Sequence, residues 1–259
     1  LQKIEIIGNV VADAELKLDY EEAYDLVVEG LAPLGERYQA LLREAHDNGW
    51  IDVEETEGKR SGAYSWGAYG THPYVLLNYS DTLNNVFTLA HEMGHSMHTW
   101  HSNKHQPVQY ADYTLFVAEV ASTVNENLMI EQLLTKTEDP EERLALLNQY
   151  LENFKGTVYR QTMFAEFELI IGKMIAEGKT LTADVLCSEY KRLNEMYYGP
   201  DMVVDDRIAM EWARIPHFYY NYYVFQYATG YSAAIALSRK ILAEGEPAVK
   251  DYLNFLSGG

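Results

Sequence analysis

The ten residues from Leu89 to His98, LAHEMGHSMH, constrain this chain more than any other stretch. They contain the pattern His-Glu-x-x-His in a setting typical of a helix. On a helix, residues four apart lie one turn above each other, so His91 and His95 present both imidazoles on one face. Two neighbouring zinc ligands need this geometry, and Glu92 lies beside them as a candidate general base. The stretch therefore predicts a metal site whose remaining ligand comes from elsewhere.

A catalytic zinc site needs a third protein ligand and keeps one position open. In metzincins this ligand is a histidine ten positions after the first, where His101 lies here. That pattern also requires glycine at the seventh position, where this chain has His98, so the metzincin arrangement is excluded. His98 itself shares the face of His91 and His95, but three stacked imidazoles on one helix do not converge on a tetrahedral ion.

A glutamate from the following helix is the favoured third ligand. Glu119 lies among apolar residues, where burying an unpaired carboxylate is costly and a metal would compensate the charge. An antiparallel helix pair joined by a polar loop over residues 103–110 would bring Glu119 back over the histidines. Glu126 lies on the same helix face as Glu119 and could accept a hydrogen bond from the second nitrogen of a ligand histidine. Glu119 is thus preferred, with His98 as the alternative.

The expected fold is mainly α-helical, with one small sheet next to the helix that carries the histidines. Segments 50–54, 62–66 and 73–79 are short, aromatic or β-branched and separated by glycines, which predicts three strands. Segment 73–79 is expected at the sheet edge, where an extended peptide could pair with its backbone. Ser80-Asp81 would then cap the next helix. The apolar run 4–11 suits a strand or an extended lead-in.

Composition narrows the class of protein further. The chain has 259 residues and 47% hydrophobic content, as expected for a globular domain. Its 39 acidic and 20 basic residues give a net charge of −19, which disfavours nucleic acid or an anionic membrane as a partner. Cys187 is the single cysteine, which suits a reducing, cytoplasmic setting. We expect residues 1–259 to form one catalytic domain. Because the first residue is not Met, we also expect this domain to be part of a longer protein.

Several motifs together resemble one peptidase family. They are GAY at 62–64, AHEMGHSMH at 90–98, FVAEVAS at 116–122, RQTMFAEFE at 160–168, IPHFYY at 215–220 and QYATG at 226–230. In this combination the chain, from about residue 20 onward, resembles oligoendopeptidase F of the thimet oligopeptidase-like zinc peptidases. The resemblance implies a zincin-type catalytic domain that lacks an N-terminal helical region. It also implies one Zn²⁺ per chain, with His91, His95 and Glu119 as ligands and Glu92 as the general base.

A second group of candidate residues crowds the segment 217–231. Tyr220, Tyr223, Tyr227 and Tyr231 recur at spacings of three or four, which predicts one stripe on a helix. Hydroxyl and imidazole donors are suited to stabilising the oxyanion of amide hydrolysis. The resemblance implies that His217 and tyrosines of this region bind substrate and stabilise that oxyanion. We assign Tyr223 and Tyr227 to this role, with Tyr220 and Tyr231 as second choices.

The sequence thus predicts a zinc-dependent endopeptidase that hydrolyses internal bonds of short oligopeptides, with a zinc-activated water and Glu92 as base. A zinc carboxypeptidase on the same scaffold is the first alternative, but the sequence positions no cation to bind a terminal carboxylate. A non-catalytic, zinc-stabilised peptide-binding module is the second. Glu92 disfavours it, because a structural site fills its fourth position with another ligand. The oligomeric state stays open.

Overall fold

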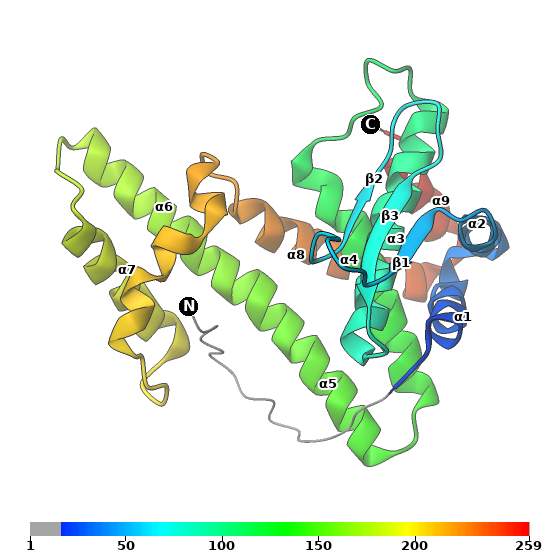
Figure 1. Cartoon of the computed structure of the whole chain (residues 1–259), viewed down its shortest axis with the longest axis horizontal. Coiled ribbons are helices and arrows are strands. Elements are labelled where there is room, and N and C mark those ends of the chain that lie inside the picture. The colour runs from blue at the N-terminus through cyan, green and yellow to red at the C-terminus, as the bar shows by residue number, and fades with distance from the viewer. Residues whose placement is uncertain (1–16, 259) are drawn as a thin grey trace. The chain divides into compact units, whose positions relative to one another are not determined.

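The computed structural model describes residues 17–258, which form two compact units. Unit 1 comprises the described residues up to Leu151 together with those from Ser232 onward, and unit 2 comprises Glu152–Tyr231. The predicted fold class, mainly helical with one small sheet, is confirmed (Figure 1). The run 4–11 lies outside the described residues, and the single catalytic domain over 1–259 stays a prediction.

Unit 1 combines helices with the three-stranded sheet. Its helices are α1 (Tyr20–Gly30), α2 (Glu36–Asp47), α3 (Leu83–His105), α4 (Leu115–Lys136) and α9 (Glu246–Leu256). Helices α5 (Pro140–Phe154) and α8 (Phe225–Glu244) contribute residues to both units. The strands are β1 (Ile51–Glu54), β2 (Tyr64–Trp66) and β3 (Tyr74–Tyr79). Strands β2 and β3 pack on α3, the helix that carries the histidines (Figure 1).

The expectation that segment 73–79 forms a sheet edge is wrong. The strand order is β1-β3-β2, so β3 is central, parallel to β1 and antiparallel to β2. Its alternating side chains explain the position, because Val75 and Leu77 are buried towards the core while both backbone edges pair with neighbours. The sheet edges in the described chain are therefore β1 and β2.

The start of α3 is fixed by Thr82 rather than by Ser80-Asp81. The Thr82 hydroxyl accepts the backbone N–H of Asn85 at 3.2 Å, which is the N-cap bond. Asn85 Oδ1 in turn accepts the backbone N–H and the hydroxyl of Ser80, at 3.0 and 2.7 Å. Asp81 adopts a left-handed φ of 56° between them. The end of β3 and the beginning of α3 are thus connected by a rigid hydrogen-bonded turn.

Helix α3 lies in the middle of the unit 1 core. Leu89, Ala90, Met93 and Met97 are completely buried, and Leu128 of α4 is buried with them. A helix that is apolar on more than one face is buried on more than one face. The His-Glu-x-x-His pattern therefore lies on a helix, α3, that is packed against its neighbours on several sides.

Helices α3 and α4 approach each other closely at Gly94. A Cβ atom at this position would lie 2.5 Å from Ser122 Cα and 2.7 Å from the carbonyl oxygen of Ala121. Because these are backbone atoms of α4, only glycine allows this separation. Asn125, completely buried on α4, donates to the Ala90 carbonyl at 3.1 Å across the same interface. The two helices are thus held in one register.

Unit 2 is built around aromatic residues. Its own helices are α6 (Arg160–Ala176) and α7 (Ala183–Tyr198), with a π turn at Lys155–Tyr159 and 3₁₀ segments at Asp206–Arg214 and Pro216–Tyr219. The rings of Phe164, Phe167, Tyr190 and Phe218 pack at centroid distances of 5.0 to 6.5 Å. The buried Glu211 accepts hydrogen bonds from Arg160 and Tyr190 at 2.7 and 2.6 Å. Ion pairing thus offsets the cost of burying this carboxylate.

The predicted tyrosine helix is wrong in its first half. Asn221 and Tyr222 have left-handed φ values of 36° and 57°, so the chain turns before α8 begins at Phe225. Tyr220 and Tyr223 therefore lie in a loop, and only the later tyrosines share a helix. Spacing alone could not show this turn, because left-handed backbone at a tyrosine is uncommon and depends on contacts from elsewhere.

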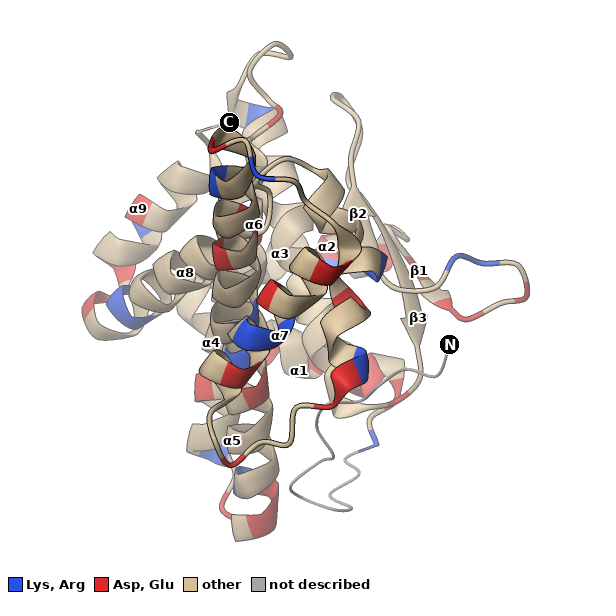
Figure 2. Cartoon of the chain, turned by 90° about the vertical axis from the view of Figure 1, so that its left-hand side faces the viewer, with Lys and Arg blue, Asp and Glu red and all other residues tan. Residues whose placement is uncertain are grey.

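Charged positions are distributed over most of the helices rather than confined to one element (Figure 2). Within residues 17–258, none of the helices has the length and apolar character needed to cross a membrane.

The Gly94 contact generates a stability prediction. Gly94→Ala should lower the free energy of unfolding by about 1–3 kcal/mol, because the added methyl group forces α3 and α4 apart. Gly156→Ala is the matched control, since a Cβ atom there would meet nothing within 4 Å. Urea denaturation followed by circular dichroism measures both variants. Equal stability of the two would contradict the proposed contact.

Burial of His101 generates a pH prediction. Burial first, and then the cationic groups around it, lower the pKa of His101 to about 4. As the pH falls below the ordinary histidine value of about 6.5, the unfolded chain binds a proton that the folded chain does not. Because of His101, the free energy of unfolding should fall by up to about 3 kcal/mol as the pH is lowered from 6.5 to 4. Denaturation curves of wild type and His101→Gln over this range measure the difference, and parallel pH dependence would contradict it.

Candidate metal centre

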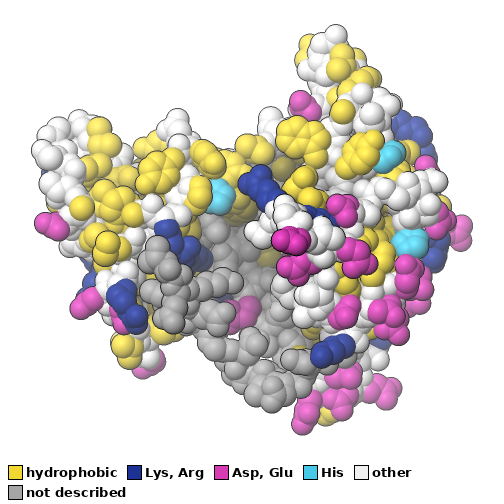
Figure 3. Space-filling view, in the orientation of Figure 1, with side chains coloured by type: hydrophobic (Ala, Val, Ile, Leu, Met, Phe, Trp, Pro, Cys, Tyr) yellow, Lys and Arg dark blue, Asp and Glu magenta, His cyan; other side chains and the backbone are white. Residues whose placement is uncertain are grey.

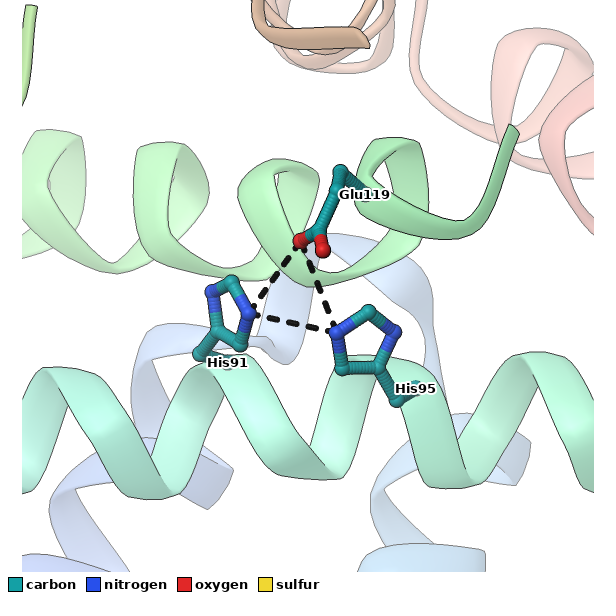
Figure 4. Close-up of side chains that lie close together, drawn as sticks. All are labelled: His91, His95 and Glu119. Carbon is teal, nitrogen blue, oxygen red and sulfur yellow. Dashed lines mark hydrogen bonds and ion pairs between the residues drawn. The ribbon is translucent and has the colours of Figure 1, made fainter. Parts of the chain in front are cut away.

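Three of the predicted site residues come together between α3 and α4. His91 and His95 point from α3 towards Glu119 of α4 (Figure 4). His91 Nε2 lies 3.2 Å from His95 Nε2, and Glu119 Oε2 lies 3.3 and 3.5 Å from these two nitrogens. Within residues 17–258, this is the one group of three or more His, Cys, Asp or Glu side chains with metal-binding proximity.

The spacing of the three atoms fits a tetrahedral zinc ion. Ligand bonds of about 2.0–2.1 Å at tetrahedral angles separate neighbouring ligand atoms by about 3.3–3.4 Å. The observed separations of 3.2, 3.3 and 3.5 Å match this triangle. The three side chains are 17 to 27% exposed, so solvent reaches the site. Two nitrogens and one oxygen are also one of the donor sets that hold zinc in catalytic sites.

Neighbouring side chains fix the orientation of two of these groups. His91 Nδ1 donates a hydrogen bond to Glu126 Oε1, one of the residues expected for this role. This bond leaves Nε2 of the imidazole directed at the other two groups. Ser122 donates its hydroxyl to Glu119 Oε2 at 3.1 Å. The histidine and the carboxylate are thus held by contacts that α4 provides.

The electrostatics of the cluster favour a cation. Burial alone would lower the pKa of His91, but hydrogen bonds from its ring to Glu119 and Glu126 raise that pKa well above the usual value. Burial would raise the pKa of Glu119, yet the imidazoles of His91 and His95 hold it well below its usual range. The negative potential that retains a proton here also attracts a metal ion, and the two compete for the same nitrogens.

Glu92 is buried beside the cluster with an unsatisfied oxygen. The residue is 6% exposed, and its Oε2 atom has no hydrogen-bond partner among the described residues. Burial raises the pKa of Glu92, while the neighbouring imidazoles of His91 and His95 lower it in part. A buried carboxylate oxygen is normally hydrogen-bonded. An unpaired Oε2 atom is suited to a carboxylate that exchanges a proton with a bound molecule.

The rejected histidine ligands lie apart from the cluster. His98 is 1% exposed and stacks on Tyr113 with ring centroids 3.6 Å apart. His101 is buried and stacks on His105 further along α3. Neither belongs to the metal-binding group. Tyr113, which our sequence analysis missed, also approaches the carbonyl oxygen of His95 with its hydroxyl at 3.5 Å. Its contact partners are distant in sequence, so no local pattern indicated it.

The second predicted group forms a cluster within unit 2. The Tyr227 hydroxyl lies 3.3 Å from His217 Nε2, and the Tyr223 ring stacks on the imidazole at 5.4 Å. Tyr220 meets the same imidazole edge-on at 6.0 Å and is largely exposed. Tyr231 is buried and packs against Phe154, away from the imidazole contacts. The structure thus brings together His217, Tyr223 and Tyr227, and their roles stay predictions.

The fold and the site define the class of the protein. A histidine pair on one helix, a glutamate from the next helix and a small adjoining sheet are the frame of a zincin. The sequence profile of Peptidase family M3 matches residues 16–259. The chain belongs to peptidase family M3.

Individual relatives agree with this family and confirm the resemblance to oligoendopeptidase F. Oligopeptidase PepF of Bacillus subtilis is 57% identical over 250 residues, covering 96% of this chain and 37% of its own length. The chromosomal oligoendopeptidase F of Lactococcus lactis subsp. cremoris is 49% identical, covering 98% of this chain and 42% of its own. The crystal structure of oligoendopeptidase-F from Enterococcus faecium is 40% identical with a TM-score of 0.67, covering 94% and 36%. The chain spans about two-fifths of the length of these curated relatives.

The Glu126 contact generates a prediction about metal affinity. Glu126→Gln should weaken zinc binding roughly 10- to 100-fold, because the charged acceptor that orients His91 is lost. Glu131→Gln on the exposed side of α4 is the matched control. Competition with a chromophoric chelator measures both affinities. If the two variants bind zinc equally well, Glu126 does not support the site.

Proposed function

We propose that this chain is the catalytic portion of a zinc-dependent endopeptidase that hydrolyses internal bonds of short oligopeptides. The observation that carries the proposal is the triangle of two histidine nitrogens and one carboxylate oxygen, with edges of 3.2 to 3.5 Å and Glu92 beside it. Membership of family M3 and relatives called oligoendopeptidase F support it. The single Cys187 supports the cytoplasm as the location.

His91, His95 and Glu119 would hold the metal. Zinc, when bound, supplies a Lewis acid that polarises a carbonyl oxygen and lowers the pKa of water. The chain's own contribution is to keep these ligands oriented through Glu126 and the α3–α4 packing. The partial exposure of the three side chains leaves one side accessible to a peptide.

Glu92 would move the proton. General bases work best when their pKa lies near the operating pH, and burial shifts the pKa of Glu92 in that direction. Its carboxylate would accept the proton of the attacking water and then donate it to the amine of the leaving peptide. The unsatisfied Oε2 atom supports this role, because it is free to accept that proton.

His217, Tyr223 and Tyr227 would bind the substrate and stabilise the oxyanion. Their mutual contacts, a hydroxyl 3.3 Å from the imidazole and a stacked ring, support a common function. Donors that are positioned before the reaction stabilise developing charge most effectively. The resemblance to oligoendopeptidase F is the reason for assigning this role to these three residues.

The free edge of β2 would pair with the peptide backbone. Among residues 17–258, β2 pairs with β3 alone, so its other edge is unpaired. Ser65 of β2 lies 2.9 Å from the hydroxyl of Ser96, which directly follows His95 on α3. Aromatic side chains are exposed on this part of the sheet, with Trp66 at 72%. Figure 3 shows hydrophobic side chains at several places on one face of the molecule. Main-chain pairing of this kind recognises extended peptides of varied sequence.

Substitution of Glu92 tests the mechanism. Glu92→Gln should retain zinc but lower kcat for a quenched fluorescent peptide roughly 10²- to 10⁴-fold, because the proton acceptor is removed. Removing zinc from the wild type with a chelator should abolish hydrolysis, and adding zinc should restore it. Mass spectrometry of the products distinguishes internal cleavage from removal of terminal residues. Hydrolysis by zinc-loaded Glu92→Gln at the wild-type rate would refute the assigned base.

A further inference from the structure

The loop that separates His217 from Tyr227 adopts an unfavourable conformation. Asn221 and Tyr222 have φ values of 36° and 57°, in the left-handed region that a bulky side chain rarely occupies. Such backbone persists only where surrounding contacts fix it. Tyr223, whose ring stacks on His217, directly follows this turn. The position of the ring therefore depends on whatever holds the turn.

One face of α6 holds both the main chain and the side chain of Tyr222. Glu168 Oε1 accepts the backbone N–H of Tyr222 at 3.1 Å. One helical turn later, Gly172 leaves room for the Tyr222 side chain, since a Cβ atom there would lie 2.1 Å from the hydroxyl oxygen. Residues four apart lie on the same helix face, so the two contacts act on the loop together.

Glu168 is a costly residue for a purely structural position. It is 5% exposed, and within residues 17–258 no lysine, arginine or histidine forms an ion pair with it. The other buried carboxylate of this unit, Glu211, has Arg160 and Arg214 as partners. Burying a carboxylate without an ion-pair partner is unfavourable, so this side chain depends on the hydrogen bonds that it accepts. This carboxylate accepts hydrogen bonds from the backbone N–H groups of Tyr222 and Val224, on either side of Tyr223.

We propose that Glu168 is a positioning residue, which holds the Asn221–Tyr222 turn so that Tyr223 and Tyr227 meet His217 in the arrangement that binds substrate. This inference rests on the proposed function of that cluster. It adds a residue of α6 that contacts neither substrate nor metal in the proposed mechanism. The geometry makes the effect specific, because Glu168 touches the turn and not the three clustered side chains.

The experiment compares variants on one helix. Glu168→Leu replaces the acceptor by an apolar side chain of similar size, and Glu168→Gln retains an acceptor oxygen. Glu166→Leu is the matched control, because it also loses one hydrogen bond, from the Tyr197 hydroxyl at 2.7 Å, on a different contact of α6. Gly172→Ala displaces the Tyr222 side chain while leaving Glu168 intact. Zinc-loaded protein is assayed with the quenched peptide, and the imidazole of His217 is followed by NMR.

Glu168→Leu and Gly172→Ala should each lower kcat/KM roughly 10- to 100-fold, because a displacement of about 1 Å at a binding group costs this much. Both should shift the His217 imidazole resonances. Glu168→Gln should restore hydrolysis to near the wild-type rate, and Glu166→Leu should change neither measurement. If Glu168→Leu fails to fold, Gly172→Ala decides the result. Unchanged His217 resonances in Gly172→Ala, and in Glu168→Leu where it folds, would overturn the proposal.

His217→Ala separates this inference from the function on which it rests. If His217→Ala leaves hydrolysis unchanged, the cluster is not the substrate-binding group and the proposed function of these residues fails. If His217→Ala impairs hydrolysis while Glu168→Leu does not, the cluster is functional and the positioning role is wrong. The NMR measurement requires no turnover, so it tests the contact between α6 and the turn whether or not the chain hydrolyses peptides.

Discussion

The contact between Gly94 of α3 and the backbone of α4 is the interaction on which the metal centre depends. Both histidines belong to one helix and the carboxylate to another, so the site exists only at one separation and register of the two. The absence of a side chain at Gly94 sets the separation, since any Cβ would lie 2.5 Å from Ser122 Cα. Asn125 fixes the register by donating to Ala90, and it accepts in turn from the Tyr38 hydroxyl of α2 at 3.0 Å. Three helices thereby support one site.

The acidic side chains of the candidate metal centre and of the unit 2 core have different kinds of charged partners. Glu211 is neutralised locally by two arginines, and its contribution is structural. Glu119 and Glu126 instead face imidazoles, whose own charge depends on protonation or on metal. Such a cluster is poorly balanced without a cation, which costs stability but gives affinity for an ion. The acidic groups between α3 and α4 are therefore the ones that suit a bound cation.

The sequence predicted that His91, His95 and Glu119 lie close together, because the two histidines are related by a local helical spacing. Four-residue spacing on a helix fixed His91 and His95, and the apolar surroundings of Glu119 indicated a buried carboxylate. The sheet order was predicted wrongly, because pairing depends on which strands meet in space, and β1 reaches β3 without adjacency in the chain. The turn at Tyr222 was also missed, since its cause lies on α6, 54 positions earlier. Local periodicity is visible in sequence, whereas a backbone conformation imposed from a distance is not.

The division of the ligands between two helices has a consequence for metal supply. His95 and Glu119 are far apart in the sequence, yet their ligand atoms lie 3.5 Å apart. An ion bound to both would bridge α3 and α4 and would stabilise the folded chain, because these ligand atoms come together only on folding. Its contribution would grow with the free metal concentration, because the ion binds the folded state. The contact between α3 and α4 would therefore be looser when free metal is scarce.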